Sequence, residues 1–357
     1  KSEQRKLENR YTLPSDYKFM KFIQQAMLQS LATVTDNQMM IWFTIVCCAA
    51  FYILHWLIRK IPVWKYSSKY VVITGCDSGF GHMLAKRLDH MDFHVFAGCV
   101  TEKGATELRK TCSNRLITLD LDVTSAAGIQ KAVKLVKSYI PPDSGIWGLV
   151  NNAGIAGEIG QVEWLTRADY DQVMAVNTFG VVDVTKAFLP LVRKARGRIV
   201  NMASVMGRFP AATASYVMSK FAVEGYSGVL RYQLRPFGVS VHVIEPGFFQ
   251  TGITSSELIK KDLENKYARL EPEIQQAYSQ EYKDTIIARA TYFLPLFNSP
   301  NVHKVVDAYT HALTARFPKT RYTVGWDANL FFRPLSLLPD WVADLMFGGF
   351  MSKPDSE

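Results

Sequence analysis

The segment Tyr-Val-Val-Ile-Thr-Gly-Cys-Asp-Ser-Gly-Phe-Gly, residues 70–81, decides the fold, because an apolar strand runs into a glycine-rich turn and then into a helix. Its glycines permit a tight turn and a close approach of the backbone to a ligand. The start of the following helix presents free N–H groups and a positive dipole end, which suit a pyrophosphate. This context predicts a dinucleotide-binding loop made of Thr74, Gly75, Asp77, Ser78, Gly79, Phe80 and Gly81.

Short apolar runs and amphipathic helices then alternate along the chain. Strands are expected at Tyr70–Ile73, His94–Ala97, Leu116–Leu119, Gly148–Val150, Arg198–Asn201 and Ser240–Ile244. Strand–helix alternation of this kind predicts an α/β fold, a Rossmann-type doubly wound parallel sheet, as a single domain over residues 68–328. Residues 255–300 are charged and helical in pattern without a strand, and we expect them to form a substrate lid.

Composition narrows the function classes. The 357 residues carry a formal charge of +9, and residues 1–67 hold nine Lys or Arg against four Asp or Glu. A basic N-terminal stretch favours an anionic membrane surface or a targeting role, and nucleic-acid binding is not expected. The five cysteines include no Cys-x-x-Cys pair, so neither a disulfide framework nor a metal site is expected.

An apolar segment precedes the domain. Residues 41–58 contain no Asp, Glu, Lys or Arg and would span about 27 Å as a helix, close to the thickness of a bilayer core. Trp42 and Trp56 near its ends fit interfacial positions, so we predict a transmembrane helix over 39–60 behind a polar and amphipathic segment, 1–38. The alternative is a buried core helix, which His55 favours. Basic residues are denser after the span than before it, which favours a main domain that faces the cytosol.

The C-terminal tail, residues 329–357, is also apolar. Its Phe, Leu and Trp side chains could enter a membrane interface or pack against the domain, and the sequence leaves both possibilities open.

A Tyr-x-x-x-Lys pair, Tyr216 and Lys220, carries the chemistry. Four residues apart on a helix, the lysine ammonium would lie near the phenol and lower its pKa, so that the phenol exchanges a proton with a substrate oxygen. Ser204, twelve residues upstream, would hold that oxygen by a hydrogen bond. Asn177 is a poor helix-interior residue, and we expect a local kink there that frees a carbonyl to hold a water.

Further cofactor contacts are expected where strands end. Asp122 and Val123 follow the third strand, where a carboxylate could accept from an adenine amino group or simply cap a turn. Asn152, Ala153 and Gly154 close the fourth strand, where they could equally be a plain turn. After the last strand, Pro246 and Gly247 could direct the backbone towards a nicotinamide, and Thr251 could contact its carboxamide.

The cofactor is expected to be NAD rather than NADP. Residues Gly98-Cys99-Val100 end the second strand, where a ribose contact belongs, and no Arg or Lys stands there. Asp77 would repel a 2′-phosphate. Glu102 could serve the ribose hydroxyls, although the neighbouring Lys103 argues the other way.

Together these motifs resemble those of the short-chain dehydrogenases, over residues 68–328. Thr-Gly-Cys-Asp-Ser-Gly-Phe-Gly at 74–81, Trp-Gly-Leu-Val-Asn-Asn-Ala-Gly at 147–154 and Gly-Trp-Asp-Ala at 325–328 resemble the membrane-bound retinol and 17β/3α-hydroxysteroid dehydrogenase branch. D-3-hydroxybutyrate dehydrogenase is also similar, around residues 311–314. Ala203 stands where many relatives have Ser, and the long N-terminal extension is unusual for the retinol enzymes.

The resemblance implies an NAD-dependent alcohol dehydrogenase acting on a lipophilic alcohol in the endoplasmic reticulum membrane, and a homo-oligomer is expected because related enzymes form dimers or tetramers. It implies that Tyr216 is the general acid/base, that Lys220 also binds the nicotinamide ribose, and that a water on Asn177 connects Lys220 to solvent. A hydroxy-acid enzyme of the mitochondrial inner membrane, with Arg208 or Lys260 binding a carboxylate, is the second hypothesis. A catalytically silent membrane scaffold is the third.

Overall fold

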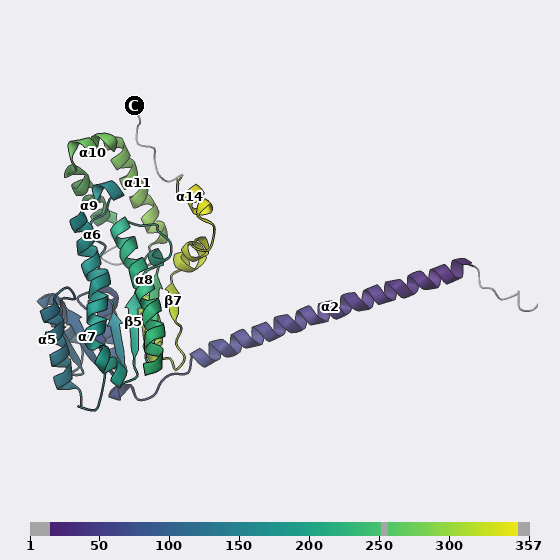
Figure 1. Ribbon diagram of the computed structural model, residues 1–357, viewed down its shortest axis with the longest axis horizontal. Coiled ribbons are helices and arrows are strands. Elements are labelled where there is room, and N and C mark those ends of the chain that lie inside the picture. Colours follow the sequence, from purple (N-terminus) through teal and green to yellow (C-terminus); the bar gives the residue numbers. More distant parts are fainter. Residues whose placement is uncertain (1–14, 251–255, 349–357) are drawn as a thin grey trace, which may run out of the picture. The chain divides into compact units, whose positions relative to one another are not determined.

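The structure, a computed structural model, describes residues 15–250 and 256–348. It divides the chain into two compact units, residues 1–61 and 62–357 (Figure 1). The described part of the first unit contains a single long helix, α2 (Ser15–Arg59). Residues Asn37–Arg59 of this helix are long and apolar enough to cross a membrane, and none of that stretch is buried.

The second unit is built on a seven-stranded sheet in the order β3-β2-β1-β4-β5-β6-β7, and every neighbouring pair is parallel. Its strands are β1 (Tyr70–Ile73), β2 (His94–Cys99), β3 (Leu116–Asp120), β4 (Gly148–Asn151), β5 (Arg198–Met202), β6 (Ser240–Pro246) and β7 (Arg321–Val324). The predicted Rossmann-type parallel sheet is therefore confirmed. Strand order reverses between β1 and β4, which places a ligand crevice above the carboxyl ends of these strands.

Helices cover both faces of the sheet, as alternating side chains require. Val71 and Ile73 of β1 face one core, with helices α3 (Gly79–His90), α4 (Glu102–Thr111) and α12 (His303–Thr314). Val72 faces the other core, with α5 (Ala126–Tyr139), α7 (Gly180–Lys194) and α8 (Ala214–Leu234). In α3, Leu84 and Leu88 lie one turn apart and are fully buried, which is the spacing of an amphipathic helix.

The seventh strand, β7, was not predicted. Its four residues pair in parallel with the end of β6, so it forms the edge of the sheet. Two of those residues are polar and only half-buried, which left too short an apolar run to be recognised.

Residues 255–300 contain the expected helices. They are α9 (Ser256–Ala268), α10 (Pro272–Ala277) and α11 (Gln280–Phe297). Leu263, Tyr282 and Ile287 from two of these helices bury Trp164, a residue of the segment between β4 and α6 (Arg167–Met174). This small core is separate from the two cores that flank the sheet.

The described part of the tail divides between the two alternatives. A π-helical turn, Ala328–Phe332, and α13 (Arg333–Leu335) bury Phe332 and Leu335 against residues 205–209. Beyond them, Leu337 is 79% exposed, and in α14 (Asp340–Gly348) Trp341 and Leu345 are also exposed.

Candidate active site

The glycine-rich turn between β1 and α3 packs directly on the turn that follows β4. Gly75 and Gly79 have φ angles of 67° and 62°, in the left-handed region that favours glycine. A Cβ on Gly75 would lie 2.7 Å from the Cα of Ala153, and one on Gly81 would lie 2.4 Å from Nδ2 of Asn152. The predicted cofactor loop therefore needs Gly75 and Gly81 for its packing on the turn after β4.

Asn152 holds the two turns together. Its side-chain amide donates to the carbonyls of Thr74 and Gly75 at 3.0 and 2.9 Å. The Thr74 hydroxyl accepts from the backbone N–H groups of Asn152 and Ala153. Tyr309 of α12 donates to Oδ1 of Asn152 at 3.2 Å. Sequence reasoning missed Tyr309, because 157 residues separate the two partners.

The acidic residues predicted near the ribose and adenine are held by local hydrogen bonds. Asp77 accepts from the backbone N–H groups of Val100 and Thr101 and from the Thr101 hydroxyl. Burial raises the pKa of Asp77, but the hydrogen bonds from Thr101 and Val100 outweigh it, so the pKa lies below its ordinary value. Asp122 accepts from the N–H and hydroxyl of Thr124, so one of its oxygens serves the turn that the sequence left as an alternative.

Glu102 does not stand free at the end of β2. Its carboxylate pairs with Arg109 and accepts from the Thr106 hydroxyl on the same helix. Arg109 also donates to Thr118 of β3. The expected ribose contact by Glu102 would therefore have to compete with this ion pair.

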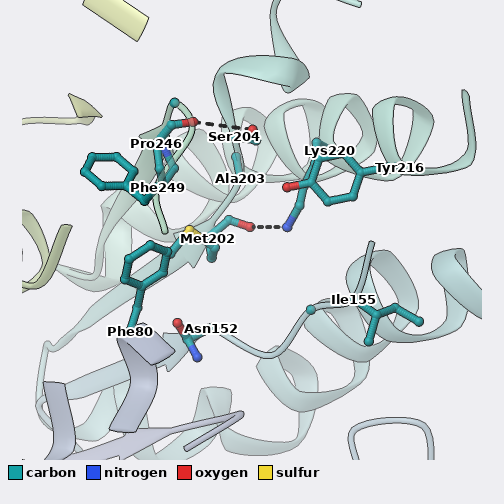
Figure 2. A pocket seen from close by; sticks show the side chains of 12 residues that line it. Phe80, Asn152, Ile155, Met202, Ala203, Ser204, Tyr216, Lys220, Pro246 and Phe249 are labelled. Atoms are coloured by element: carbon teal, nitrogen blue, oxygen red, sulfur yellow. Dashed lines mark hydrogen bonds between the residues drawn. The ribbon is translucent and has the colours of Figure 1, made fainter. Parts of the chain in front are cut away.

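Three of the predicted catalytic residues converge beyond the carboxyl ends of β5 and β6. Ser204 follows β5, and its hydroxyl accepts from Met206 N–H at 3.2 Å and donates to the Pro246 carbonyl at 3.4 Å. Lys220 of α8 donates to the carbonyl of Met202 at 3.2 Å (Figure 2). Its ammonium nitrogen lies 5.4 Å from the ring centroid of Tyr216, one turn earlier on the helix.

The electrostatics of this group differ from the sequence expectation. Burial lowers the pKa of Lys220 to about 8, while the negative charge of Glu224 raises it. Burial raises the pKa of Tyr216, and a hydrogen bond with Ser204 only partly offsets this. The predicted lowering by Lys220 is wrong for this arrangement, because desolvation of the phenol dominates and the lysine bonds to a carbonyl instead.

Asn177 lies behind the pocket. The helix is π-helical over Ala175–Phe179, so its hydrogen bonding is irregular at the position where a kink was expected. Its amide donates to the Ile155 carbonyl and the Ser219 hydroxyl, and its Oδ1 accepts from Ile155 N–H. A Cβ on Gly154 would lie 3.3 Å from Oδ1 of Asn177 and 3.6 Å from Nζ of Lys220. Gly154 therefore keeps the space between Asn177 and Lys220 open.

These residues enclose a pocket of about 110 Å³ (Figure 2). The structure brings together in it Phe80, Asn152, Gly154, Ser204, Tyr216, Lys220, Pro246 and Gly247 from the predicted set, and adds Ile155, Met202, Ala203 and Phe249. The other predicted residues, Asn177 among them, do not line it, and Thr251 lies outside the described residues. No cluster of His, Cys, Asp or Glu able to hold a metal occurs in residues 15–250 and 256–348.

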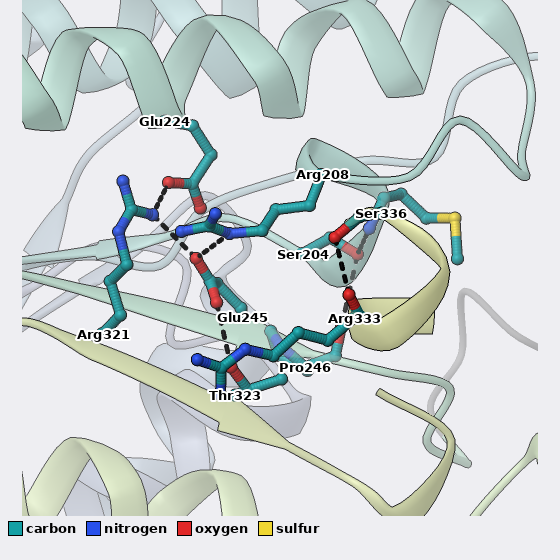
Figure 3. A network of polar contacts seen from close by, with 10 residues as sticks. Ser204, Arg208, Glu224, Glu245, Pro246, Arg321, Thr323, Arg333 and Ser336 are labelled. Carbon is teal, nitrogen blue, oxygen red and sulfur yellow. Dashed lines mark hydrogen bonds and ion pairs between the residues drawn. The ribbon is translucent and has the colours of Figure 1, made fainter. Parts of the chain in front are cut away.

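A buried ionic network ties the elements around this pocket together (Figure 3). Glu245, two residues before Gly247, accepts from Arg208 at 2.8 Å, from Arg321 at 2.7 Å and from the Thr323 hydroxyl at 3.1 Å. Arg321 also pairs with Glu224 of α8. The network joins the segment after Ser204, α8 and β7, and the sequence showed none of these contacts.

The same two arginines separate the pKa values of the two carboxyl groups. Burial raises the pKa of Glu224 to about 7, with the charge of Glu245 adding to it. Burial alone would raise the pKa of Glu245, but its bonds to Arg208 and Arg321 outweigh burial and lower the pKa overall.

A model of the short-chain dehydrogenase family matches residues 69–262, more than half of the chain. The chain belongs to this family. This short-chain dehydrogenase is 43% identical over 313 residues to retinol dehydrogenase 5 of Mus musculus, covering 88% of this chain and 98% of the relative. It is 43% identical to 17-beta-hydroxysteroid dehydrogenase type 6 of Homo sapiens, covering 85% and 95%. These relatives place the dehydrogenase in the retinol and hydroxysteroid branch.

Solved structures share the fold of the dehydrogenase. A short-chain dehydrogenase from Burkholderia phymatum in complex with NAD has a TM-score of 0.62 at 23% identity, covering 83% of this chain and 99% of its own. One from Burkholderia cenocepacia in complex with NADP has a TM-score of 0.59 at 21% identity, covering 81% and 100%. The family binds nicotinamide cofactors, and these two structures hold different ones.

Proposed function

We propose that this protein is an NAD-dependent oxidoreductase that interconverts a lipophilic secondary or allylic alcohol, such as a retinol or a hydroxysteroid, and its carbonyl compound. The observation that carries the proposal is the convergence of Ser204, Tyr216 and Lys220 in one pocket, beside the Pro246-Gly247 turn. A hydroxyl, a phenol and an ammonium group at one point suit proton exchange with a substrate oxygen.

Each group has a role in this reaction. The Ser204 hydroxyl would hydrogen-bond the substrate oxygen and orient it towards Tyr216. Tyr216 would give a proton to that oxygen during carbonyl reduction and take it during alcohol oxidation. The ammonium group of Lys220 would hold the ribose of the cofactor by hydrogen bonds. Asn177 would position Lys220 from behind and hold a water that passes protons to solvent.

The glycine-rich turn fits a nicotinamide dinucleotide. Side chains are absent from Gly75, Gly79 and Gly81, and α3 begins at Gly79, so the turn and the helix start suit the pyrophosphate. When bound, the nicotinamide exchanges a hydride equivalent with the substrate carbon. The low pKa of Asp77 supports NAD, because an ionised carboxylate beside the end of β2 disfavours a 2′-phosphate.

The pocket lining favours a lipophilic substrate over a hydroxy acid. Lys220 is the one charged side chain among the twelve residues that line it. The two cations considered for a substrate carboxylate are both paired elsewhere, Arg208 with Glu245 and Lys260 with Glu264. Leu337, Trp341 and Leu345 are exposed and would receive an apolar substrate. Their segment packs, through Phe332 and Leu335, on the same apolar cluster as Tyr216. Helices α9–α11 would form the lid.

The setting of the enzyme follows from its exposed apolar surfaces. We place Asn37–Arg59 in the membrane of the endoplasmic reticulum, with the mitochondrial inner membrane as the alternative. A stripe on α8 made of Met218, Phe221, Val229 and Tyr232 is exposed at helical spacing and suits a homo-oligomer contact.

The test is NADH formation by the detergent-solubilised full chain with retinol, 3α- and 17β-hydroxysteroids and 3-hydroxybutyrate, with NADP in parallel. Tyr216→Phe should lower turnover by about 10²–10⁴-fold and keep the NAD affinity, because only the proton-transferring oxygen is removed. Tyr139→Phe, an exposed tyrosine at the end of α5, is the matched control. Undiminished turnover in Tyr216→Phe would refute the mechanism, and turnover of 3-hydroxybutyrate alone would refute the substrate class.

A further inference from the structure

The amino edge of the sheet, opposite the pocket, gathers positive charge from four separate segments. These are residues 62–69, 193–197, 235–239 and 315–320, which lead into β1, β5, β6 and β7. They hold eight Lys or Arg and no Asp or Glu. Because the sheet is parallel, all four lie at one edge. We call this surface the amino-edge patch, and its exposed cations are Lys65, Arg193, Lys194, Arg196, Arg235, Arg316 and Lys319.

Contacts join the four segments in two pairs. Pro62 bridges to Ala315, and Val63 N–H donates to the Thr314 carbonyl at 2.7 Å. A Cβ on Gly238 would lie 3.3 Å from Cδ of Arg196. The segment that leads into β4 lies between the starts of β1 and β5 and carries the exposed Asp143, so the positive charge lies on both sides of one carboxylate.

A buried cation strengthens the positive field behind the patch. Arg198, the first residue of β5, is 5% exposed, donates to the Ala312 carbonyl and lies 4.6 Å from the ring centroid of Trp147. Lys69 lies 3.8 Å from the same ring. Burial lowers the pKa of Lys69, and the charge of Arg198 lowers it further.

Exposed aromatic rings accompany these cations. Trp64 is 75% exposed, and Phe237 and Phe317 are each 49% exposed. Arg193 lies over Phe237 and Arg316 lies over Phe317, at 5.1 and 5.8 Å from the ring centroids. Aromatic rings interleaved with Lys and Arg are typical of a surface that lies in the headgroup layer of a bilayer.

Chain connectivity selects the partner. Only Lys60 and Ile61 lie between the end of the candidate span at Arg59 and Pro62, the first residue of the patch segments. The three Cα–Cα steps from Arg59 to Pro62 extend about 11 Å at most. A segment tethered this closely to a span, and this basic, would meet the charged surface of the leaflet from which the span emerges.

We propose that the amino-edge patch binds anionic lipid headgroups and seats the catalytic unit on the bilayer by its amino edge. The phosphate and carboxylate groups of a phosphatidylserine-type lipid would pair with the patch cations, and Trp64, Phe237 and Phe317 would enter the headgroup layer. This goes beyond the proposed catalytic function and does not depend on it.

The test is hydrogen exchange of the full chain in nanodiscs of phosphatidylcholine, with and without about 30% phosphatidylserine. We expect exchange in residues 62–69, 235–239 and 315–320 to slow by at least about fivefold with the anionic lipid. The slowing should be lost in 0.5 M NaCl, where charges are screened beyond about 4 Å, and in Lys65→Glu/Arg316→Glu/Lys319→Glu. The control with equal charge change is Lys131→Glu/Lys134→Glu/Lys304→Glu, at exposed lysines of α5 and α12.

Three results would overturn the proposal. The first is exchange that does not respond to phosphatidylserine, or that responds equally in both triple variants. The second is protection of residues 336–348 in either lipid with none at the amino edge, which would place the opposite edge on the bilayer. The third is stronger protection by a DNA duplex than by phosphatidylserine at physiological salt, which would assign the patch to nucleic acid. If the Glu variant fails to fold, the corresponding Gln variant answers the same question.

Discussion

At the scale of single residues, one buried carboxylate holds the turn expected to face the nicotinamide. Asp327 is fully buried and accepts from Phe248 N–H at 2.7 Å. The pKa of Asp327 is raised overall, because the effect of burial exceeds the lowering by this hydrogen bond. A Cβ on Gly247 would lie 2.1 Å from Oδ2 of Asp327. The glycine is therefore required by close approach of the carboxylate, in addition to any contact with a cofactor.

Gly247→Ala should consequently destabilise the protein by about 1–3 kcal/mol and weaken nucleotide binding, because a methyl group must displace the buried carboxylate. The matched control is Gly225→Ala in the middle of α8, where an added Cβ meets nothing within 4 Å. That change should stabilise the protein by about 0.5–1 kcal/mol. Thermal unfolding and NAD titration of both variants measure the contrast, and equal effects would show that Asp327 does not restrict the turn.

The residues of the pocket differ in how visible they were in the sequence. Tyr216 and Lys220 were predictable because a helix converts a spacing of four into proximity, and Ser204 because it follows a strand. Asp327 and Tyr309 were not predictable, because their partners Phe248 and Asn152 lie 79 and 157 residues away. The raised pKa of Tyr216 also depends on burial, which a spacing does not report.

At the scale of elements, the first six strands were predicted from their apolar runs, and five of them are buried along most of their length. In β3 only Leu116 and Leu119 are buried. The edge strand β7 was not, because it alternates buried and half-buried positions over four residues. Yet β7 supplies Arg321, which bonds both Glu224 and Glu245. Strand β7, which was the least apparent in the sequence, thus completes the ionic network beside α8.

That network predicts a pH dependence of stability. The pKa of Glu224 is raised from 4.5 to about 7 on folding. At Glu224 the native state therefore holds a proton that the unfolded state has lost between about pH 4.5 and 7, so the contribution of this group to stability falls as pH rises through that window. The raised pKa corresponds to a loss on the order of 3 kcal/mol at most for this mostly buried group. His242 acts in the opposite direction, because burial lowers its pKa from 6.5 to about 4. Glu224→Gln cannot ionise, so the stability of the wild type relative to this variant should fall between pH 4.5 and 7.5.

Urea unfolding of both proteins at pH 4.5, 5.5, 6.5 and 7.5 measures the effect. Glu257→Gln, at an exposed glutamate in the first turn of α9, is the control and should keep the wild-type slope. A stability difference between the wild type and Glu224→Gln that does not change with pH would assign the proton uptake to another group.

At the scale of the whole molecule, two helical stretches within residues 15–250 and 256–348 are long and apolar enough to cross a membrane, and burial distinguishes them. Arg167–Lys194 is half buried, because α7 covers one face of the sheet, whereas Asn37–Arg59 has no buried residues. The lack of charge in the sequence predicted a membrane span in the region of Asn37–Arg59 and left a core helix as the alternative. In the described residues no core covers it, and a bilayer is the environment that would bury such a surface.

Two arginines in the centre of this stretch should therefore release the protein from membranes. Val46→Arg/Ala49→Arg adds about 2.5–3.5 kcal/mol per residue to the cost of insertion, because each charge would lie in hydrocarbon. In alkaline carbonate the wild type should stay in the membrane pellet and the variant should move to the supernatant. Leu135→Arg/Lys137→Arg, on the exposed face of α5, should stay in the pellet. Release of the wild type itself would show that α2 does not span the bilayer, since peripheral attachment through charges alone does not survive these conditions.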